Sequence, residues 1–175
     1  GATQVEAYLG VPLRQISSRE AQGSRICEVE WRLALVDTAG QPIHRGVERL
    51  AFAVEDEEAS AGSFVPDVAS ARIPPGDYRL AIQMTDKTSG KLGIYHQEVT
   101  VPGYGDDLAM SDLELSWSVA PEGHGDKFRK RGLWVIPMPS RSFRSGQPPH
   151  VYYEVYNLRE DEFGRTRYRI SYTIR

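Results

Sequence analysis

The sequence is poor in cysteine and lysine and has no long hydrophobic run. With one cysteine in 175 residues, neither an internal disulfide nor a cysteine-rich zinc site can form. No apolar run approaches the roughly 20 residues that a helix needs to cross a bilayer, so we expect no membrane span. Hydrophobic residues make up 40% of the chain and charged residues 26%, which excludes a disordered or collagen-like protein. The chain is long enough to bury a core without covalent cross-links.

Charge is distributed unevenly along the chain. The formal net charge is −3, but residues 123–175 hold 11 Lys and Arg against 5 Asp and Glu. This stretch therefore carries +6, and residues 1–122 carry −9. A basic C-terminal third suits an acidic partner or a nucleic acid. It also suits the acidic first part of the same chain, and we favour this pairing within the molecule.

Apolar and polar residues alternate with a period of two through most of the chain, which predicts half-buried β-strands. In residues 27–35 every odd position is apolar. Cys27 has the same parity as Trp31, so we predict that both side chains are buried and that the thiol is not a nucleophile. Turn sequences separate the alternating runs. The strands predicted in this first part are 3–13, 25–37, 42–54, 64–73, 77–86 and 92–101.

Six or seven short antiparallel strands in about 100 residues are typical of an immunoglobulin-like or fibronectin type III-like sandwich. Tyr78 follows a Pro-Gly-Asp turn, which resembles the position of the tyrosine corner in such sandwiches. The sequence therefore predicts an all-β protein in which residues 1–103 form an Ig-like β-sandwich. The acidic stretch 55–59 lacks a helical period, so we expect a loop or a single turn there.

A second set of strands is predicted after a linker at 102–107. These strands are 110–119, 133–137, 139–144, 149–158 and 166–174, and the glycine-rich stretch 121–132 between the first two is expected to be mobile. They are too few to close a sandwich. We therefore predict that residues 104–175 are a second, incomplete β-sandwich segment, which either adds to the first sandwich or is truncated at Arg175.

Several segments carry a family resemblance. They are Pro-Gly-Asp-Tyr-Arg-Leu at 75–80, Leu-Ala-Met-Ser-Asp-Leu-Glu-Leu at 108–115, Val-Ile-Pro-Met-Pro-Ser-Arg-Ser-Phe at 135–143, Val-Tyr-Tyr-Glu-Val-Tyr-Asn-Leu at 151–158 and Gly-Arg-Thr-Arg-Tyr-Arg-Ile-Ser-Tyr-Thr-Ile at 164–174. These segments resemble β-rich regions of bacterial GWxTD-domain-containing proteins. The Gly-Trp-x-Thr-Asp motif itself is absent, so the resemblance implies an accessory segment of such a protein. It carries over no activity and no functional residue.

Residues suited to catalysis or to metal binding are scattered. The four histidines, at 44, 96, 124 and 150, form no ligand-spaced pair. His124 with Asp126, and Asp106 with Asp107 for calcium, come nearest to metal sites but lack a recognised spacing. Nucleophile motifs and phosphate-binding glycine loops are missing. We expect no metal, no cofactor and no enzymatic activity.

Tyrosines in the predicted strand 149–158 are candidates for ligand binding. Tyr153 shares the parity of the neighbouring valines, and we assign it to the core. Tyr152 and Tyr156 share the opposite face. Sugars stack on such aromatic faces in many carbohydrate-binding modules, so Tyr152 and Tyr156 are the candidate ligand-binding residues.

The last predicted strand has the most regular alternation. Arg165, Arg167 and Arg169 face one way, and Tyr168 and Ile170 face the other. Arginines on an outward face commonly pair with acidic side chains across a sheet, so we expect no nucleic-acid binding. An edge strand with one apolar face recruits other strands. We predict that this strand pairs with the first sandwich or mediates a homodimer, with the three arginines at the interface.

The hypothesis that follows is a non-catalytic β-sandwich module for protein interaction or structure, within a larger bacterial protein. Its partner is another protein or a second copy, bound through an edge strand. The family resemblance favours the periplasm or cell envelope, although the single cysteine suits either side of the inner membrane. The alternative function is carbohydrate binding through surface aromatic residues.

Overall fold

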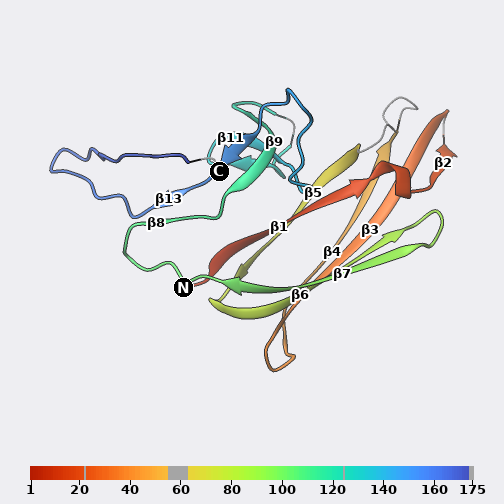
Figure 1. Ribbon diagram of the computed structural model, residues 1–175. Coiled ribbons are helices and arrows are strands. Elements are labelled where there is room, and N and C mark those ends of the chain that lie inside the picture. Colours follow the sequence, from red (N-terminus) through yellow and green to blue (C-terminus); the bar gives the residue numbers. More distant parts are fainter. Residues whose placement is uncertain (22, 55–62, 124, 174–175) are drawn as a thin grey trace.

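The computed structural model describes residues 1–21, 23–54, 63–123 and 125–173 (Figure 1). The predicted all-β class is confirmed, since the described residues form strands and one 3-10 turn, Leu13–Gln15, with no α-helix. Among them there is consequently no helix that could span a membrane. The predicted loop at 55–59, the metal candidate His124, and residues 174–175 lie outside the described residues.

The first layer is an antiparallel sheet built around β3 (Ser24–Asp37). One edge of β3 pairs with β4 (Pro42–Ala53). The other edge pairs first with β2 (Ser18–Ala21) and then with β6 (Gly76–Asp86), and β7 (Leu92–Val101) pairs with β6. The strand order is therefore β4-β3-β6-β7, with β2 beside the first residues of β3.

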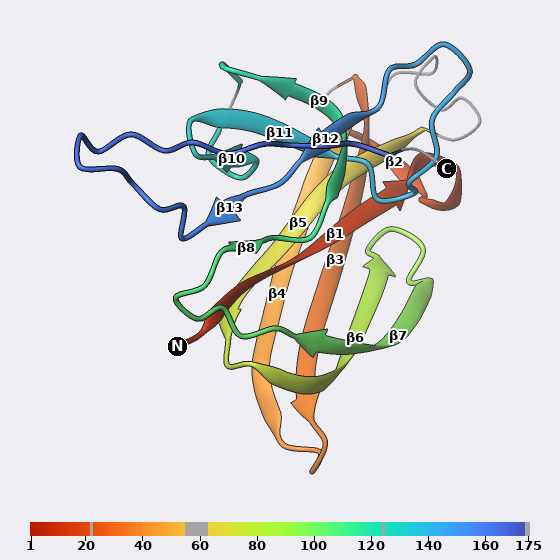
Figure 2. The same cartoon turned by 60° about the vertical axis from the view of Figure 1, so that its left-hand side comes forward.

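The middle layer is a two-stranded antiparallel ribbon of β1 (Thr3–Pro12) and β5 (Phe64–Ile73) (Figure 2). Successive side chains of a strand point to opposite faces, so the odd positions of β1 share one face. That face packs on the first layer, where Leu9 is buried with Trp31 and Leu80 in one apolar cluster. The apolar core thus lies between the first and middle layers.

The third layer covers the other face of the ribbon (Figure 2). It contains a sheet of β10 (Arg129–Lys130), β11 (Leu133–Pro137), β9 (Glu114–Ala120) and β12 (His150–Tyr152), in that order, and a separate pair of β8 (Ala109–Met110) and β13 (Val155–Tyr156). The even-numbered side chains of β1 face this layer, because the Tyr8 hydroxyl lies 2.8 Å from Glu114 Oε2. The division into domains 1–103 and 104–175 stays a prediction. Contacts such as that between Tyr8 and Glu114 connect the two parts.

Three residues of the first part lie where the sequence predicts. Cys27 and Trp31 are 3% and 4% exposed, which confirms their burial. The Tyr78 hydroxyl donates a 2.8 Å hydrogen bond to the Pro74 carbonyl, four residues upstream. This bond has the form of a tyrosine corner.

Strand boundaries up to Val101 agree closely with prediction, except that β2 was not predicted, and they agree less well beyond Val101. The predicted strand 139–144 does not form, and 149–158 is split into β12 and β13. The stretch 121–132 contains β10, and Gly123 packs so tightly against the Trp134 indole that a Cβ atom would overlap the ring. The described residues of this stretch thus make specific contacts, and their mobility stays a prediction.

The alternation of Leu113, Leu115, Trp117 and Val119 predicts an apolar inner face for β9, as the neighbouring valines do for β12, and the structure reverses both faces. Glu114 and Ser116 are buried, whereas Trp117 is 47% exposed. Val151 is exposed, and Tyr153 is only half-buried, so Tyr153 is not a core residue as predicted. The reason is that β9 turns its polar face toward the ribbon, where the Tyr8 hydroxyl of β1 and the Lys130 ammonium of β10 bond to Glu114.

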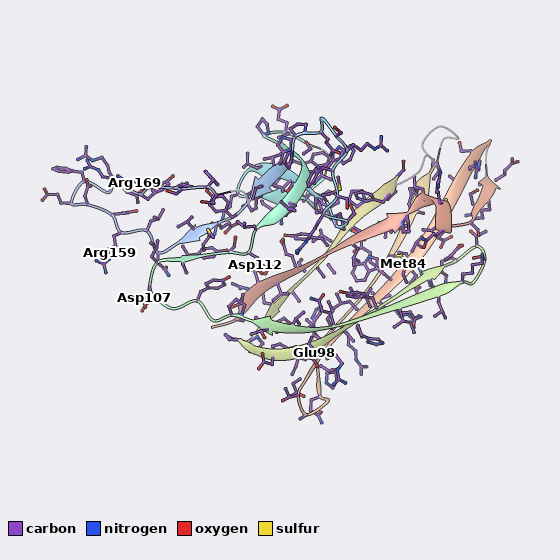
Figure 3. The ribbon with its side chains drawn as sticks, in the orientation of Figure 1. Met84, Glu98, Asp107, Asp112, Arg159 and Arg169 are labelled. Atoms are coloured by element: carbon purple, nitrogen blue, oxygen red, sulfur yellow. The ribbon has the colours of Figure 1, made fainter. Side chains whose placement is uncertain are left out.

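Residues 166–173 form no sheet strand, which corrects the prediction of a paired strand over 166–174. Within the described part of this segment, the one β contact is an isolated bridge between Thr166 and Glu160. A strand needs a neighbour at hydrogen-bonding distance, and here the segment runs on an arm that stands away from the first layer (Figure 3).

Candidate functional site

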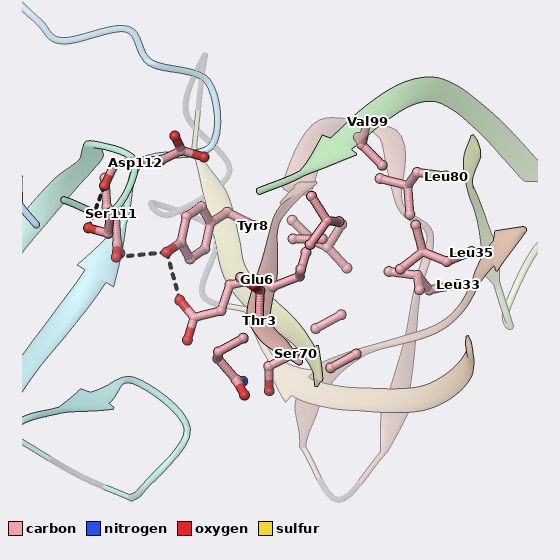
Figure 4. Close-up of a pocket in the computed structure, with 18 of the residues that line it drawn as sticks. Thr3, Glu6, Tyr8, Leu33, Leu35, Ser70, Leu80, Val99, Ser111 and Asp112 are labelled. Carbon is pink, nitrogen blue, oxygen red and sulfur yellow. Dashed lines mark hydrogen bonds between the residues drawn. The ribbon is translucent and has the colours of Figure 1, made fainter. Parts of the chain in front are cut away.

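A hollow of about 1660 Å³ follows the free edge of β1 (Figure 4). Apolar side chains of the first layer, including Leu33, Leu80 and Val99, line one side. Polar side chains of the third layer, including Glu114 and Lys130, line the other. The hollow therefore has an apolar wall beside a charged wall, with a strand edge between them.

Strand β7 forms the rim of this hollow and is incompletely covered. Tyr95 lies directly opposite Ile82 of β6, and cross-strand partners point to the same face of a sheet. Ile82 is buried in the core, yet Tyr95 is 54% exposed. The inner face of β7 therefore extends beyond the cover that the ribbon provides.

The outer edge of β7 is also open. Among the described residues, the strand pairs with β6 alone. Natural edge strands are commonly protected by charged residues or proline. The other edge strand of this sheet, β4, has Pro42, Arg45 and Arg49, whereas β7 contains no proline, lysine or arginine. The β7 edge is thus the less protected of the two.

A cluster of charged and aromatic residues forms the polar wall. Lys130 of β10 forms ion pairs with Glu6 of β1 and Glu114 of β9. Its Nζ atom donates a 2.8 Å hydrogen bond to the Tyr8 hydroxyl and lies 5.5 Å from the centre of the Tyr152 ring. Burial, together with the negative charge of Glu114 and Glu6, raises the pKa of Tyr8 far above its usual range. The phenol is therefore neutral, and the cluster joins the ribbon to the third layer.

A second ion pair joins the layers at the far side of the ribbon. Asp67 of β5 is fully buried and accepts a 2.6 Å hydrogen bond from Trp31 Nε1. Lys127 forms ion pairs with Asp67 and with Glu48 of β4. Burial would lower the pKa of Lys127, but its hydrogen bonds to Asp67 and Glu48 raise it. Basic residues of the last third therefore pair with acidic residues of the first part, as we favoured from the charge distribution.

The two candidate tyrosines lie in different strands but line the same hollow. The Tyr152 hydroxyl donates a 2.8 Å hydrogen bond to Glu154 Oε1, and burial and this bond raise its pKa above the usual range. The Tyr156 ring packs against Tyr104, with 5.2 Å between ring centres. Each tyrosine therefore already has a partner within the molecule, and a role of the two in ligand binding stays a prediction.

The three candidate arginines are exposed on the C-terminal arm. Arg165 lies close to Asp161, with 3.3 Å between Nε and Oδ2, and its guanidinium covers the Phe163 ring. Arg169 lies far from Glu98 of β7 in the same molecule (Figure 3). Whether these arginines form an interface stays a prediction.

Neither of the charged clusters resembles a metal site. No group of three or more His, Cys, Asp or Glu side chains in the described residues is arranged to hold a metal ion. The cluster residues Lys130 and Tyr8 escaped the sequence analysis because they lie 122 positions apart. The signal that pointed toward them was the opposite charge of the two parts of the chain.

Comparisons with known proteins add no relative. No family model, no curated protein and no solved structure matches this chain.

Proposed function

We propose that this chain is a non-catalytic interaction module of a larger bacterial protein, and that it binds an extended polypeptide segment by strand addition at β7. The observation that carries the proposal is Tyr95, which is 54% exposed although its cross-strand partner Ile82 is in the core. A strand placed beside β7 would pair with the open edge and cover this inner face. Strand addition of this kind supplies affinity through main-chain hydrogen bonds and specificity through alternate side chains.

The finer classification of the fold is part of the proposal. The Tyr78 corner bond, the buried Trp31 on β3 and the placement of the β1–β5 ribbon opposite β3, β6 and β7 support an immunoglobulin-like or fibronectin type III-like arrangement. The resemblance to accessory regions of GWxTD-domain-containing proteins supports a bacterial source and a place in the periplasm or cell envelope.

The test uses a phage-displayed library of random peptides of about ten residues, panned on the chain and on two variants. Tyr95→Lys places a charge on the open inner face. Val47→Lys is the matched control, because Val47 is an exposed apolar residue on β4, the other edge strand. Peptides with apolar residues at every second position should be enriched on the wild type and the control, and lost on Tyr95→Lys.

Two results would overturn the proposal. One is the absence of enriched peptides, or their retention by Tyr95→Lys. The other is binding to a glycan array that Tyr156→Ala removes, which would assign the hollow to carbohydrate binding. Tyr156→Phe serves as the control in that array, because it keeps an aromatic ring for stacking.

A further inference from the structure

The C-terminal arm carries strand-forming residues without a sheet. Tyr168, Ile170 and Tyr172 alternate with arginine and serine and are 59%, 44% and 73% exposed. In the described residues the arm has a single bridge, at Thr166, and no ladder. Apolar side chains with a strand period usually cover a sheet edge or a core face. Among the described residues they belong to no sheet, and each stays about half exposed or more.

We propose that the segment bound at β7 is residues 165–173 of a second copy of this chain. This inference rests on the proposed function and names its partner. Nine residues in extended conformation span about 30 Å, which matches the ten-residue β7. The arm therefore has the length and the alternation that the open edge requires.

Charge supports β7 as the acceptor edge. With Tyr168 and Ile170 turned toward the hollow, the arginines of a strand beside β7 lie on the outer face of the sheet. Tyr95 and Gln97 are odd positions of β7 and point to the inner face. Glu98 is an even position and therefore points to that outer face. Beside β1, the same arginines would face a wall of mixed charge, in which Lys130 and Arg131 are already paired with carboxylates of Glu6, Glu114 and Glu154. The overall charges agree, because the arm belongs to a part at +6 and β7 to a part at −9.

The arm of a second copy can reach β7 more easily than the arm of the same molecule can. The arm starts on the third layer and stands away from β7 (Figure 3). Its return path is close to β12, since the Tyr172 and Tyr153 hydroxyls lie 2.7 Å apart. Two copies can exchange arms reciprocally, which covers both arms and closes the assembly as a dimer.

Disulfide trapping tests the contact. Ile170→Cys is placed in one tagged copy, and Tyr95→Cys, Gln97→Cys or Val99→Cys in a differently tagged copy. Facing side chains on neighbouring strands have Cβ atoms about 5 Å apart, close enough for a disulfide after mild oxidation. At least one of the three mixtures should give a covalent heterodimer carrying both tags. Val47→Cys mixed with Ile170→Cys is the matched control and should not cross-link, and the native Cys27 is buried in every variant.

Sedimentation of the full chain tests the assembly in solution. The wild type should dimerise with concentration, Tyr95→Lys and Ile170→Asp should each weaken the dimer about tenfold or more, and Val47→Lys should not. A monomer at all concentrations, the absence of a covalent heterodimer from all three mixtures, or a dimer unaffected by Tyr95→Lys would overturn the inference. If library peptides still bind at β7 in those cases, the proposed function stands with another partner. If they do not, the proposed function fails as well.

Discussion

The strands before and after residue 103 are stabilised by different contacts. Strands β1–β7 are mostly ten or more residues long and enclose one apolar cluster that extends from Leu9 to Val101. Strands β8–β13 have two to seven residues, and β9 buries Glu114 and Ser116 against the ribbon. Among the described residues, Glu114 Oε1 and Ser116 Oγ have no hydrogen-bond partner. The third layer thus combines a few buried apolar side chains, such as Val135 and Met138, with charge pairs to a sandwich that has its own larger core.

This difference indicates which region carries the stability of the molecule. Burial of large apolar side chains contributes about 1.5–3 kcal/mol each, whereas a buried ion pair contributes little net stability but is costly to break. We therefore expect the first two layers to determine global unfolding. The third layer should depend on a few specific charges.

The largest expected effect separates two tryptophans. Trp31→Ala should lower the free energy of unfolding by about 3–5 kcal/mol, because it removes a core side chain and leaves Asp67 without its indole donor. Trp117→Ala, at a half-exposed position of β9, should cost about 1 kcal/mol or less. Denaturant unfolding monitored by circular dichroism measures both. Equal losses of unfolding free energy in the two variants would show that the two regions share one core, and would contradict the difference described above.

An intermediate effect is expected at the polar wall. Lys130→Met should destabilise the third layer by about 2–4 kcal/mol, since it leaves Glu6 and Glu114 unpaired. Hydrogen exchange should then accelerate in β9 and β12 but not in β3. Adding Glu114→Gln should recover part of the loss. Lys91→Met, at an exposed lysine, is the matched control, and uniform acceleration through β3 would contradict local stabilisation.

The smallest expected effect depends on pH and compares two aspartates that cap turns. Although burial opposes it, hydrogen bonds from the Ser89 hydroxyl and from the Ser17 and Thr88 backbone amides hold the pKa of Asp86 well below its usual range. A lowered folded pKa stabilises the protein above the unfolded pKa of about 3.9, and this stability is lost as pH falls further. Asp86→Asn should therefore cost about 1–3 kcal/mol at neutral pH.

The loss caused by Asp86→Asn should narrow as the pH falls below about 4, because the wild-type carboxylate then loses its advantage. Thermal unfolding at several pH values measures this convergence. Asp161 caps the turn of the C-terminal arm through Arg165 and Phe163 but is exposed, so Asp161→Asn should change the melting temperature little. A pH-independent loss at Asp86 would show that the side chain acts by shape rather than by charge.

For the first part of the chain, the sequence predicted most strand limits and the burial of key side chains. Alternation and turn residues predicted the limits of β1 and β3–β7 and the burial of Cys27, because one face of each strand there is apolar and packs on the same core. The same rule misassigned β9, since Glu114 is buried next to Lys130 and Tyr8, and such pairing leaves no periodic signal. The candidate site shows the same limit. Whether the edge of β7 is open depends on which strands pair with it. The residues of β7 alone do not show this pairing.

The ribbon of β1 and β5 has a consequence for changes in chain length. Both of its faces are specified, because Leu9 enters the apolar core and Tyr8 enters the polar cluster. A shift of register by one residue exchanges the two faces of a strand. An insertion or deletion within β1 would therefore drive a phenol into the core and, in the same step, place leucine among the carboxylates. We therefore expect a one-residue insertion or deletion to be tolerated better in the exposed turn at 38–41 than within β1.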